Sequence, residues 1–437
     1  MTTIEGAKPL TPPTRDPALA VEVMACHECG LLHWLPPMRE QQVAACTACG
    51  ATLGQRVHRG IDRALACYMG ALVLFYVANA YPIMSMTIEG RTQSTTIIAG
   101  SQALWDAGIP ALSMVVLLAG TLLPLFKILG NLYVLAPLRL NRSPAGLGAV
   151  FRLIMRIQPW AMMEVYLLGL IVAYVKLGDL ADLHLGIAAV AFVVLILVMI
   201  AGDANLEAQE VWGRIAPQAG PEVLRPRPGT TLIGCHTCNQ LLRLPSEEAE
   251  HGHCPRCGAH LHRRKPDSLA RAWALMIAAV ILYVPANLYP VMTVIYLGQG
   301  DPSTIMGGVI MLLHEGMVPV ALLVFFASVV VPVLKIAGLA FLLVSVQKRS
   351  IWRPRQRTVL YRVIEGVGRW SMVDVFMIAI LTALVKLGAL ASIEPGHGAV
   401  AFSGVVILTM VAAMSFDPKL IWDVIDERAG GQAQARA

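Results

Sequence analysis

Long apolar stretches separated by short polar segments dominate the hydrophobic pattern of this chain. A helix needs about 20 largely apolar residues to cross the hydrocarbon core of a bilayer. Eight segments meet that requirement, and none shows the alternation of a β-barrel strand. They are residues 64–86, 109–138, 157–175, 185–202, 272–298, 317–346, 370–385 and 399–415. The pattern therefore predicts an all-α polytopic membrane protein with eight spans.

The composition supports this class of protein. Hydrophobic residues make up 56% of the 437 residues and charged residues 14%, whereas an average soluble domain is roughly 25% charged. So few polar side chains are not enough to cover the surface of soluble domains of this total length. The net charge of +6 comes mostly from loops between the spans, so it does not indicate a nucleic-acid partner.

Lysine and arginine residues mark one side of the predicted protein. They gather in residues 56–63, 139–156, 263–271 and 348–369. The opposite side carries only Arg91, with Lys176 and Lys386 at helix ends. Because Lys and Arg in short loops favour the cytoplasm, we expect both termini and the polar middle of the chain there. No apolar run precedes a small-residue cleavage site in the first 60 residues, so we expect no removed signal peptide.

The chain contains an internal repeat, in which a module of four spans occurs twice. The motifs Asn-x-Tyr-Pro, Pro-x-x-Lys, Trp-x3-acid and Val-Lys-Leu-Gly occur in the first half and again, in the same order, in the second. Asn79 recurs as Asn287, 208 positions later, and Glu164 recurs as Asp374, 210 positions later. An even number of spans gives both copies the same orientation, so we predict a parallel repeat.

Eight of the nine cysteines form two sets, one just before each module. Each set consists of two Cys-x2-Cys pairs, which we call knuckles. The sets are Cys26, Cys29, Cys46 and Cys49, and Cys235, Cys238, Cys254 and Cys257. Such spacing is typical of a tetrahedral Zn²⁺ site. Since four thiolates leave no open coordination position, we expect two structural zinc ions that fold small ribbons and do not catalyse.

Disulfides, structural iron and redox chemistry are the competing interpretations of these cysteines. The predicted cytoplasmic location disfavours disulfides, because thiols stay reduced there. The ninth cysteine, Cys67, lies in the first span, where we expect a buried and inert thiol.

The spans and the ribbons together divide the chain into seven segments. We predict a disordered N-terminus at 1–20, a zinc ribbon at 21–58, a four-helix transmembrane module at 60–205, a linker at 206–230, a second zinc ribbon at 231–263, a second four-helix module at 266–426 and a disordered tail at 427–437.

Four ionisable side chains lie inside the predicted spans, where a charge is costly and therefore indicates function. At 1.5 Å per residue, Lys127 lies about 16 Å and Glu164 about 12 Å from the cytoplasmic boundary, which is compatible with a buried pair. Lys335 lies as deep as Lys127, but Asp374 lies only about 7 Å deep. Lys335 therefore needs another partner or a water-filled cavity. We expect these four residues to line a transport cavity.

Two further pairs of residues repeat within the spans. Pro124 and Pro332 lie three residues before the internal lysines, and each is expected to kink its helix and loosen nearby carbonyls. The repetition favours a functional cavity, although helix packing also uses such kinks. Lys176 and Lys386 end spans at the outer face, where snorkelling is favoured over a role in gating or at an interface.

Asn79 and Asn287 lie about 24 Å into their spans, and Tyr81 and Tyr289 follow them with a proline. This motif marks the outer end of a broken helix or a belt position. A structural turn and a lining for substrate exit are equal alternatives. The outer loops that follow are short and β-permissive, so we expect small strands or a docking surface.

The chain lacks two groups of catalytic motifs. It has no G-x4-G-K-[ST] phosphate loop, so we expect no ATPase within it. It has no Ser/His/Asp or H-E-x-x-H signature, so we predict that the protein is not an enzyme.

The two ribbons and the repeated motifs resemble the paraquat-inducible protein A family over residues 26–426. The segment 415–423 also fits, whereas the corresponding stretch of the first module, 202–206, departs from the pattern. The resemblance implies a bacterial inner-membrane protein that works with a periplasmic MCE-domain tunnel protein to move phospholipid between the two membranes. The lysine and acid residues would then bind a lipid headgroup or carry protons that couple transport to the membrane gradient.

Two other interpretations stay open. In the first, the chain is a non-transporting anchor that holds the tunnel protein and relays cytoplasmic signals through the zinc ribbons. In the second, it is a proton-coupled exporter of small redox-active compounds. Lipid crosslinked to cavity residues would favour transport, whereas crosslinking of the outer loops alone to the partner would favour the anchor.

Overall fold

The computed structural model describes residues 3–4, 22–35, 42–55, 57–88, 91–142, 144, 146–177, 182–216, 230–245, 252–296, 299–314, 316–385 and 391–425. Within these residues, eight helical segments are long and apolar enough to cross a membrane. They are Gly60–Ala80, Pro110–Arg139, Leu147–Leu177, Ile187–Asn205, Ser268–Leu288, Val318–Gln347, Pro354–Leu384 and His397–Ser415. The eight predicted spans are confirmed, and the chain is a multi-pass membrane protein.

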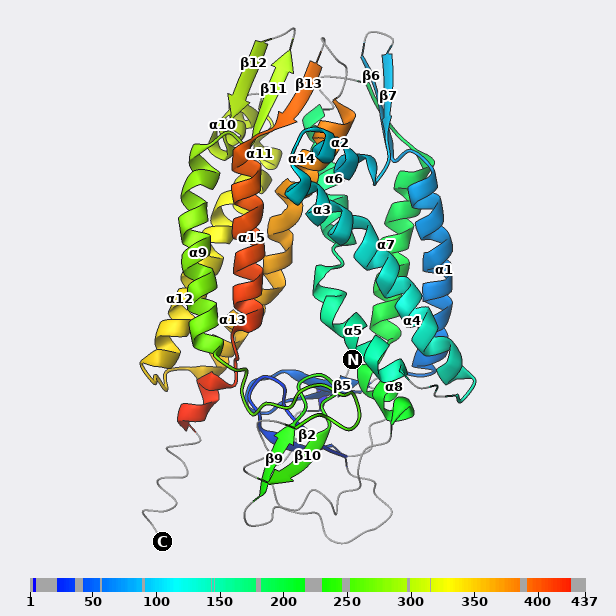
Figure 1. The fold of residues 1–437 in the computed structure, drawn as a ribbon, viewed down its shortest axis with the longest axis vertical. Helices are drawn as coiled ribbons and strands as arrows, with labels where there is room; N and C mark the ends of the chain where they lie inside the picture. The colour runs from blue at the N-terminus through cyan, green and yellow to red at the C-terminus, as the bar shows by residue number, and fades with distance from the viewer. Residues whose placement is uncertain are drawn as a thin grey trace.

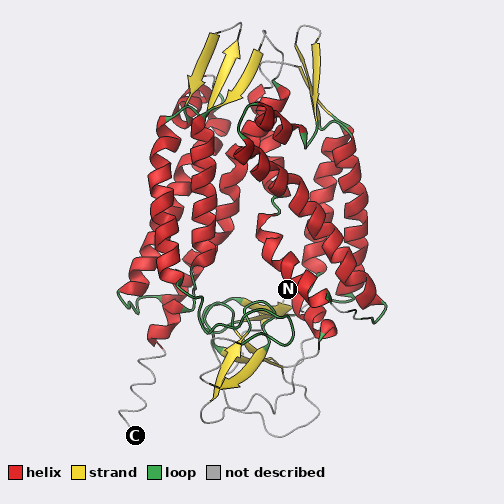
Figure 2. Cartoon of the chain, in the orientation of Figure 1, coloured by secondary structure: helices red, strands yellow, loops and turns green. Residues whose placement is uncertain are grey.

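The helices form two modules of the same design (Figures 1 and 2). Module 1 holds α1 (Gly60–Ala80), α2 (Ala99–Asp106), α3 (Pro110–Leu117), α4 (Leu123–Arg139), α5 (Leu147–Ile157), α6 (Met163–Leu177), α7 (Ile187–Asn205) and α8 (Ala208–Ile215). Module 2 holds α9 (Ser268–Leu288), α10 (Ile305–His314), α11 (Val318–Phe325), α12 (Val331–Gln347), α13 (Pro354–Gly368), α14 (Val373–Leu384) and α15 (His397–Ser415). In each module the first span packs along the fourth, α1 on α7 and α9 on α15.

Each module carries a three-stranded antiparallel sheet beyond its spans, which confirms the predicted strands. The first sheet has the order β7 (Arg91–Thr95), β6 (Met84–Ile88), β8 (Asp182–Leu185), and the second β12 (Gln299–Ser303), β11 (Met292–Tyr296), β13 (Ala391–Pro395). Met84 lies opposite Thr95 and Leu185 in the central register. We call this end of the molecule the sheet side.

The predicted spans 64–86 and 272–298 are wrong at their outer ends. The helices stop at Ala80 and Leu288, and Met84–Ile88 and Met292–Tyr296 are strands. A proline follows each helix end, and proline does not continue a helix because it lacks an N–H and clashes with the preceding turn. The β-branched residues beyond it favour an extended chain.

The two ribbons lie together at the opposite end, which we call the ribbon side (Figure 1). Ribbon 1 contains β2 (Glu22–Ala25), β3 (Leu32–Leu35), β4 (Val43–Ala45) and β5 (Thr52–Gln55), and β1 (Thr3–Ile4) pairs with β4. Ribbon 2 contains β9 (Thr230–Gly234) and β10 (Leu241–Pro245). The predicted linker begins with α8, whose Trp212 is buried against Phe151. The rest of the linker at 217–229, the tail at 427–437 and most of residues 1–20 lie outside the described residues.

The third span of each module is longer than predicted and is broken in the middle. These spans begin at Leu147 and Pro354 instead of Ile157 and Trp370, because amphipathic half-helices precede the apolar runs. Short 3₁₀ turns, Gln158–Trp160 and Arg369–Met372, separate α5 from α6 and α13 from α14. Every residue of α14 is buried, and this half-helix packs against α6 and α2 of module 1. The two modules therefore meet through the sheet-side halves of their third spans.

Candidate functional site

Both cysteine sets come together as predicted, in two closed clusters on the ribbon side. The Sγ atoms of Cys26 and Cys49, and those of Cys29 and Cys46, are 3.5 Å apart. In ribbon 2 the same distance joins Cys235 to Cys257 and Cys238 to Cys254. Within each set the four sulfur atoms lie within 4.8 Å of one another. Zn–S bonds of about 2.3 Å in a tetrahedron require sulfur atoms about 3.8 Å apart, so each cluster fits a zinc ion.

The chemistry of the donor set also suits a metal. Hydrogen bonds among the four thiols, chiefly with Cys29, lower the pKa of Cys26 to about 6, and hydrogen bonds within the same set raise the pKa of Cys29. In ribbon 2 such hydrogen bonds, chiefly with Cys238, lower the pKa of Cys235 to about 7 and raise the pKa of Cys238. The thiolate is the form that binds metal ions. The 3.5 Å separations are far longer than the about 2.05 Å of a disulfide.

Two features of the knuckles support this geometry. Gly30, Gly50 and Gly258 have φ angles of 79°, 73° and 69°, as expected where the chain folds back around a metal. The sequence interpretation missed His33, whose buried Nε2 lies 3.2 Å from the Sγ of Cys46. Its place on β3 between the knuckles gave no spacing signal, because it belongs to neither Cys-x2-Cys pair.

In module 1 the predicted pairing of Lys127 with Glu164 is wrong. Lys127 Nζ lies 2.6 Å from Oδ2 of Asp203 on α7, and the Tyr68 hydroxyl donates to Oδ1 of the same carboxylate at 2.5 Å. Glu164 is exposed at the start of α6, just after the break in the third span. Asp203 was missed because the predicted span 185–202 ends one residue before it, whereas α7 continues to Asn205.

In module 2 the corresponding lysine and acid lie at different depths. Lys335 is 3% exposed, and its Nζ donates to the carbonyl oxygen of Gly368 at 3.4 Å. Asp374 lies ten residues before the sheet-side end of α14 at Leu384, about 15 Å along the helix. The predicted depth of about 7 Å from the cytoplasmic boundary is wrong, because the span begins at Pro354.

Asp374 lines a small cavity between the modules. The cavity has a volume of about 40 Å³, and Ser328 and Lys176 also line it. Asp374 is 6% exposed, and its Oδ2, the Ser328 hydroxyl and the Ser371 hydroxyl have no hydrogen-bond partner among the described residues. Lys176 comes from α6 of module 1, so this residue, expected at the membrane surface, instead reaches the module boundary. Its repeat equivalent Lys386 lies outside the described residues.

The remaining repeated motifs have local roles in the structure. π-helical turns at Leu118–Leu122 and Phe326–Val330 precede Pro124 and Pro332, so the second spans are irregular where the prolines predict it. The side chains of Asn79 and Asn287 donate to carbonyl oxygens one turn back in their own helices. Tyr81 and Tyr289, exposed at the helix ends, lie at a position typical of an interfacial belt.

The fold and these sites define a class of protein, a polytopic helical membrane protein of two like-oriented modules with two four-cysteine ribbons. The sequence model of the family described as paraquat-inducible protein A matches residues 61–216 and 269–426. The chain therefore belongs to this family, as the resemblance predicts.

Individual relatives match nearly the whole chain. It is 34% identical to "Intermembrane transport protein PqiA" of Escherichia coli over 414 residues, covering 92% of this chain and 96% of the relative. It is 30% identical to "Lipophilic envelope-spanning tunnel protein A" of the same species, covering 91% and 90%. It is 27% identical to "Probable intermembrane transport protein" of Haemophilus influenzae, covering 95% and 99%. No solved structure matches the chain.

Proposed function

We propose that this chain is the inner-membrane component of an intermembrane lipid transport system. It passes phospholipid between the inner membrane and a periplasmic MCE-domain tunnel protein. The names of the relatives, an intermembrane transport protein and a lipophilic envelope-spanning tunnel protein, support the transport and the hydrophobic cargo. The concentration of Lys and Arg in the loops on the ribbon side supports a cytoplasmic location for both ribbons and both termini.

The observation that carries this proposal is the buried polar chemistry of module 2. Lys335 and Asp374 are 3% and 6% exposed, and such groups are expensive in a membrane unless they serve passage of a substrate or a proton. The cavity at Asp374, about 40 Å³, has room for water and none for a lipid. Asp374 therefore carries protons that couple transport to the membrane gradient.

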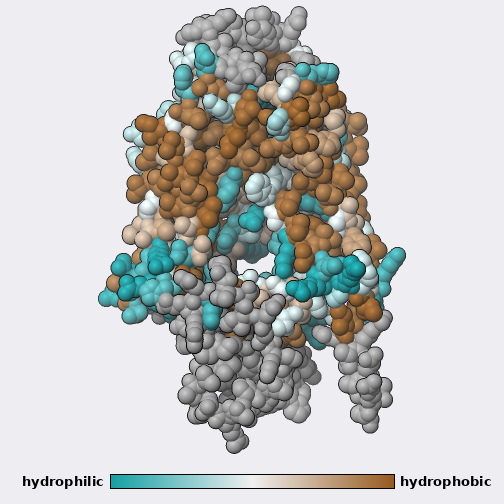
Figure 3. Space-filling model, turned by 180° about the vertical axis from the view of Figure 1, so that it is seen from behind, coloured by the Kyte–Doolittle hydropathy of each residue, from teal (hydrophilic) through white to brown (hydrophobic). Residues whose placement is uncertain are grey.

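A larger space suits the lipid headgroup. Figure 3 shows a hollow between the two modules, toward the ribbon side of the molecule, with hydrophilic residues at its edge. A hydrophilic hollow at membrane depth is a suitable environment for a phospholipid headgroup, whose acyl chains remain against the apolar span surfaces. We therefore assign the lipid headgroup to the hollow and the proton to the small cavity.

Neutralising variants test the transport proposal. Lys335→Met and Asp374→Asn, each at the wild-type protein level, should impair outer-membrane lipid homeostasis in cells that depend on this chain. Lys127→Met and Glu164→Gln are the matched changes in module 1 and should have smaller effects on transport. Normal homeostasis in both module 2 variants would refute the proposal.

We also infer that one Zn²⁺ ion occupies each ribbon. Cys26, Cys29, Cys46 and Cys49 hold the first ion, and Cys235, Cys238, Cys254 and Cys257 hold the second. The ion supplies the folding of a ribbon too small to have a sufficient apolar core. Metal analysis of the purified chain should find about two zinc ions, and Cys26→Ser or Cys235→Ser should lower that number. A metal-free protein with intact thiols would contradict the inference.

A second function, that of a non-transporting anchor for the tunnel protein, is favoured by the two sheets beyond the spans. The two sheets, one around β6 and the other around β11, present a defined surface on the side away from the ribbons. Photocrosslinkers at Lys335 and at Thr87 in β6 separate the two functions. Phospholipid captured at Lys335 supports transport, whereas partner protein captured at Thr87 with no lipid at Lys335 supports the anchor.

A further inference from the structure

Each ribbon docks on the module that it does not precede. Ribbon 1 comes before module 1, but Arg362 of α13 in module 2 donates from Nη2 to the carbonyl oxygen of Cys49 at 2.9 Å. Ribbon 2 comes before module 2, but Arg152 of α5 in module 1 donates from Nη1 to the carbonyl oxygen of Cys257 at 2.6 Å. The connections between ribbons and modules therefore cross.

The two contacts are equivalent in the repeat. The residue numbers 152 and 362 differ by 210, and the numbers 49 and 257 differ by 208, which are the offsets of the spans. In each contact an arginine on the ribbon-side half of the third span meets the last cysteine of a ribbon. A single accidental hydrogen bond does not recur at both copies, so the crossed docking is a property of the module.

The acceptor carbonyl depends on the folding of its knuckle. Gly50 and Gly258 follow the two cysteines with positive φ angles of 73° and 69°, which only a folded-back chain requires. A Cβ built on Gly258 would lie 3.1 Å from Nη1 of Arg152, so the glycine leaves room for the guanidinium. Because the metal holds the knuckle in this shape, it also holds the carbonyl in place for the arginine.

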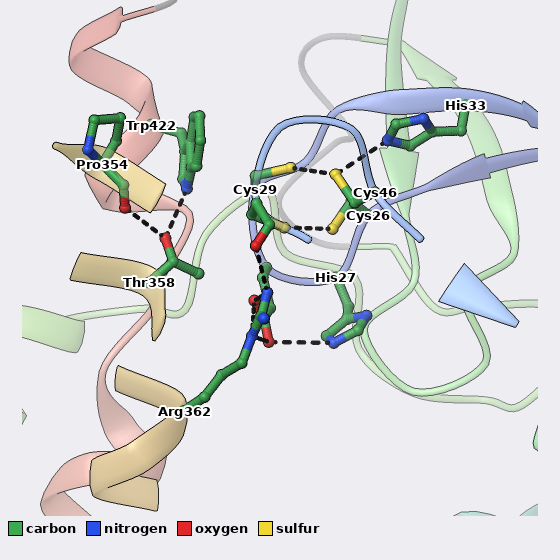
Figure 4. A network of polar contacts seen from close by, with 11 residues as sticks. Cys26, His27, Cys29, His33, Cys46, Pro354, Thr358, Arg362 and Trp422 are labelled. Carbon is green, nitrogen blue, oxygen red and sulfur yellow. Dashed lines mark hydrogen bonds and ion pairs between the residues drawn. The ribbon is translucent and has the colours of Figure 1, made fainter. Parts of the chain in front are cut away.

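The contact of ribbon 1 is the stronger of the two. Nε of Arg362 lies 2.7 Å from both carboxylate oxygens of Glu28, and Figure 4 shows Arg362 reaching the knuckle beside Cys29. Burial raises the pKa of Glu28, but hydrogen bonds from His27 and Arg362 outweigh it and hold the pKa below its usual value. The residue before the second cysteine of ribbon 2 is Thr237, which has no charge. Charge-assisted hydrogen bonds are roughly twice as strong as neutral ones.

The arginines lie on half-helices that a short turn separates from the rest of their spans. α5 and α13 each join the sheet-side half of the third span through a 3₁₀ turn. The half-helix α14 is buried along its whole length between module 1 (α6, α2) and elements of its own module (β13, α15), whereas α13 contains exposed residues and contacts ribbon 1 through Arg362. The ribbon contact therefore fixes the half-helix that the apolar core fixes least.

We propose that Arg152 and Arg362 are positioning residues through which the metal-folded ribbon of one module holds the ribbon-side half of the third span in the other module. Loss of metal from ribbon 1 then loosens α13 of module 2, and loss of metal from ribbon 2 loosens α5 of module 1. The proposal rests on metal-filled ribbons and does not depend on the transported substrate.

Hydrogen–deuterium exchange of the full chain in lipid nanodiscs tests the crossed connection. Cys26→Ser/Cys29→Ser should raise amide exchange in residues 354–368 and leave residues 147–157 unchanged. Cys235→Ser/Cys238→Ser should do the opposite. If each change instead raises exchange only in the module that follows the altered ribbon, the proposal is wrong.

Arginine variants separate positioning from ribbon folding. Arg362→Ala should raise exchange in α13 by about tenfold or more, the value of a hydrogen bond to a charged group, while the zinc content stays at the wild-type level. Arg152→Ala should raise exchange in α5 by a smaller factor, and Arg362→Lys should restore part of the protection. Arg369→Ala, at an exposed site after α13, is the control and should have no effect. Unchanged exchange in Arg362→Ala, or loss of zinc from it, would overturn the proposal.

Discussion

The two modules share a fold but differ in what surrounds their buried lysines. In module 1, Asp203 neutralises Lys127 and accepts a hydrogen bond from Tyr68. In module 2, Ala413 takes the place of Asp203, at the repeat offset of 210, and Met276 takes the place of Tyr68, at the offset of 208. Module 2 has therefore kept the lysine without its charged partner.

The acidic residues show the reverse difference. Asp374 is buried, and the hydroxyls of Ser328 and Ser371 have no hydrogen-bond partner in the part of the chain that the structure describes, whereas Glu164, the equivalent of Asp374 in module 1, is exposed. The hydroxyls Ser328 and Ser371 correspond to Gly120 and Ala161. Unsatisfied polar groups inside a membrane protein lower stability and persist where they have a function. This comparison supports the proposal that module 2 carries the buried charged residues used in transport, whereas the ion pair of module 1 stabilises the fold.

The largest expected effect separates the two lysines. Lys335→Met should lower phospholipid movement between the membranes by about tenfold or more, as for a group that acts in the transport step, and should keep or raise thermal stability, because Lys335 makes no ion pair among the described residues. The measurements are movement of labelled phospholipid in cells and thermal unfolding of the purified chain. Wild-type transport in this variant would remove the functional difference between the modules.

Removing the acid of module 1 should instead lower stability. Asp203→Ala leaves the ammonium of Lys127 buried without a counter-charge, which costs about 2–4 kcal/mol for a pair that is partly exposed. The double variant Lys127→Met/Asp203→Ala should recover most of that loss. Thermal unfolding in one detergent checks both values, and a double variant as unstable as Asp203→Ala would contradict the ion-pair account.

A smaller effect is expected from the hydroxyl that supports the same carboxylate. Tyr68→Phe removes one hydrogen bond to Asp203 and should lower the free energy of unfolding by about 1–2 kcal/mol. Met276→Leu, at the equivalent position of module 2, keeps the side-chain volume and should change it less. Equal losses from both substitutions would show that packing, and not the hydrogen bond, stabilises this position of α1.

The smallest effect tests a feature in which the modules agree. Asn79→Ala and Asn287→Ala each remove a hydrogen bond to a carbonyl oxygen of the same helix, with an expected loss of about 1 kcal/mol of stability and no loss of transport. Thermal unfolding and lipid movement check the pair. A transport defect in either variant would instead place that asparagine on the path of the substrate.

Local patterns in the sequence predicted much of this structure. Apolar runs of about 20 residues identify spans because the bilayer thickness fixes their length, and cysteine spacing identifies ribbons because one ion needs four thiolates. The outer ends of the spans 64–86 and 272–298 could not be found from hydropathy alone. Their last residues are apolar on the strands β6 and β11 as well.

The contacts between modules could not be read from the chain. Lys176 reaches the cavity of Asp374 because α6 packs on α14, and Arg362 meets ribbon 1 across more than 300 residues, with Cys49 313 positions away. Such pairings depend on the tertiary arrangement, and they produce no periodic pattern in the sequence near either residue. Asp203 is different, since it lies one residue beyond the predicted span 185–202, and a span extended by one turn would have brought it under the rule for charges in membranes.

The central claim is that the buried charged residues used in transport belong to module 2. It is tested most directly by comparing Asp374 of module 2 with Glu164, the equivalent residue of module 1. The measurement is the initial rate at which labelled phospholipid moves between inner and outer membranes in cells carrying Asp374→Asn or Glu164→Gln at equal protein level. We predict that Asp374→Asn lowers this rate by about tenfold or more and that Glu164→Gln leaves it near the wild-type value. Equal rates in the two variants, or a loss confined to Glu164→Gln, would contradict the account.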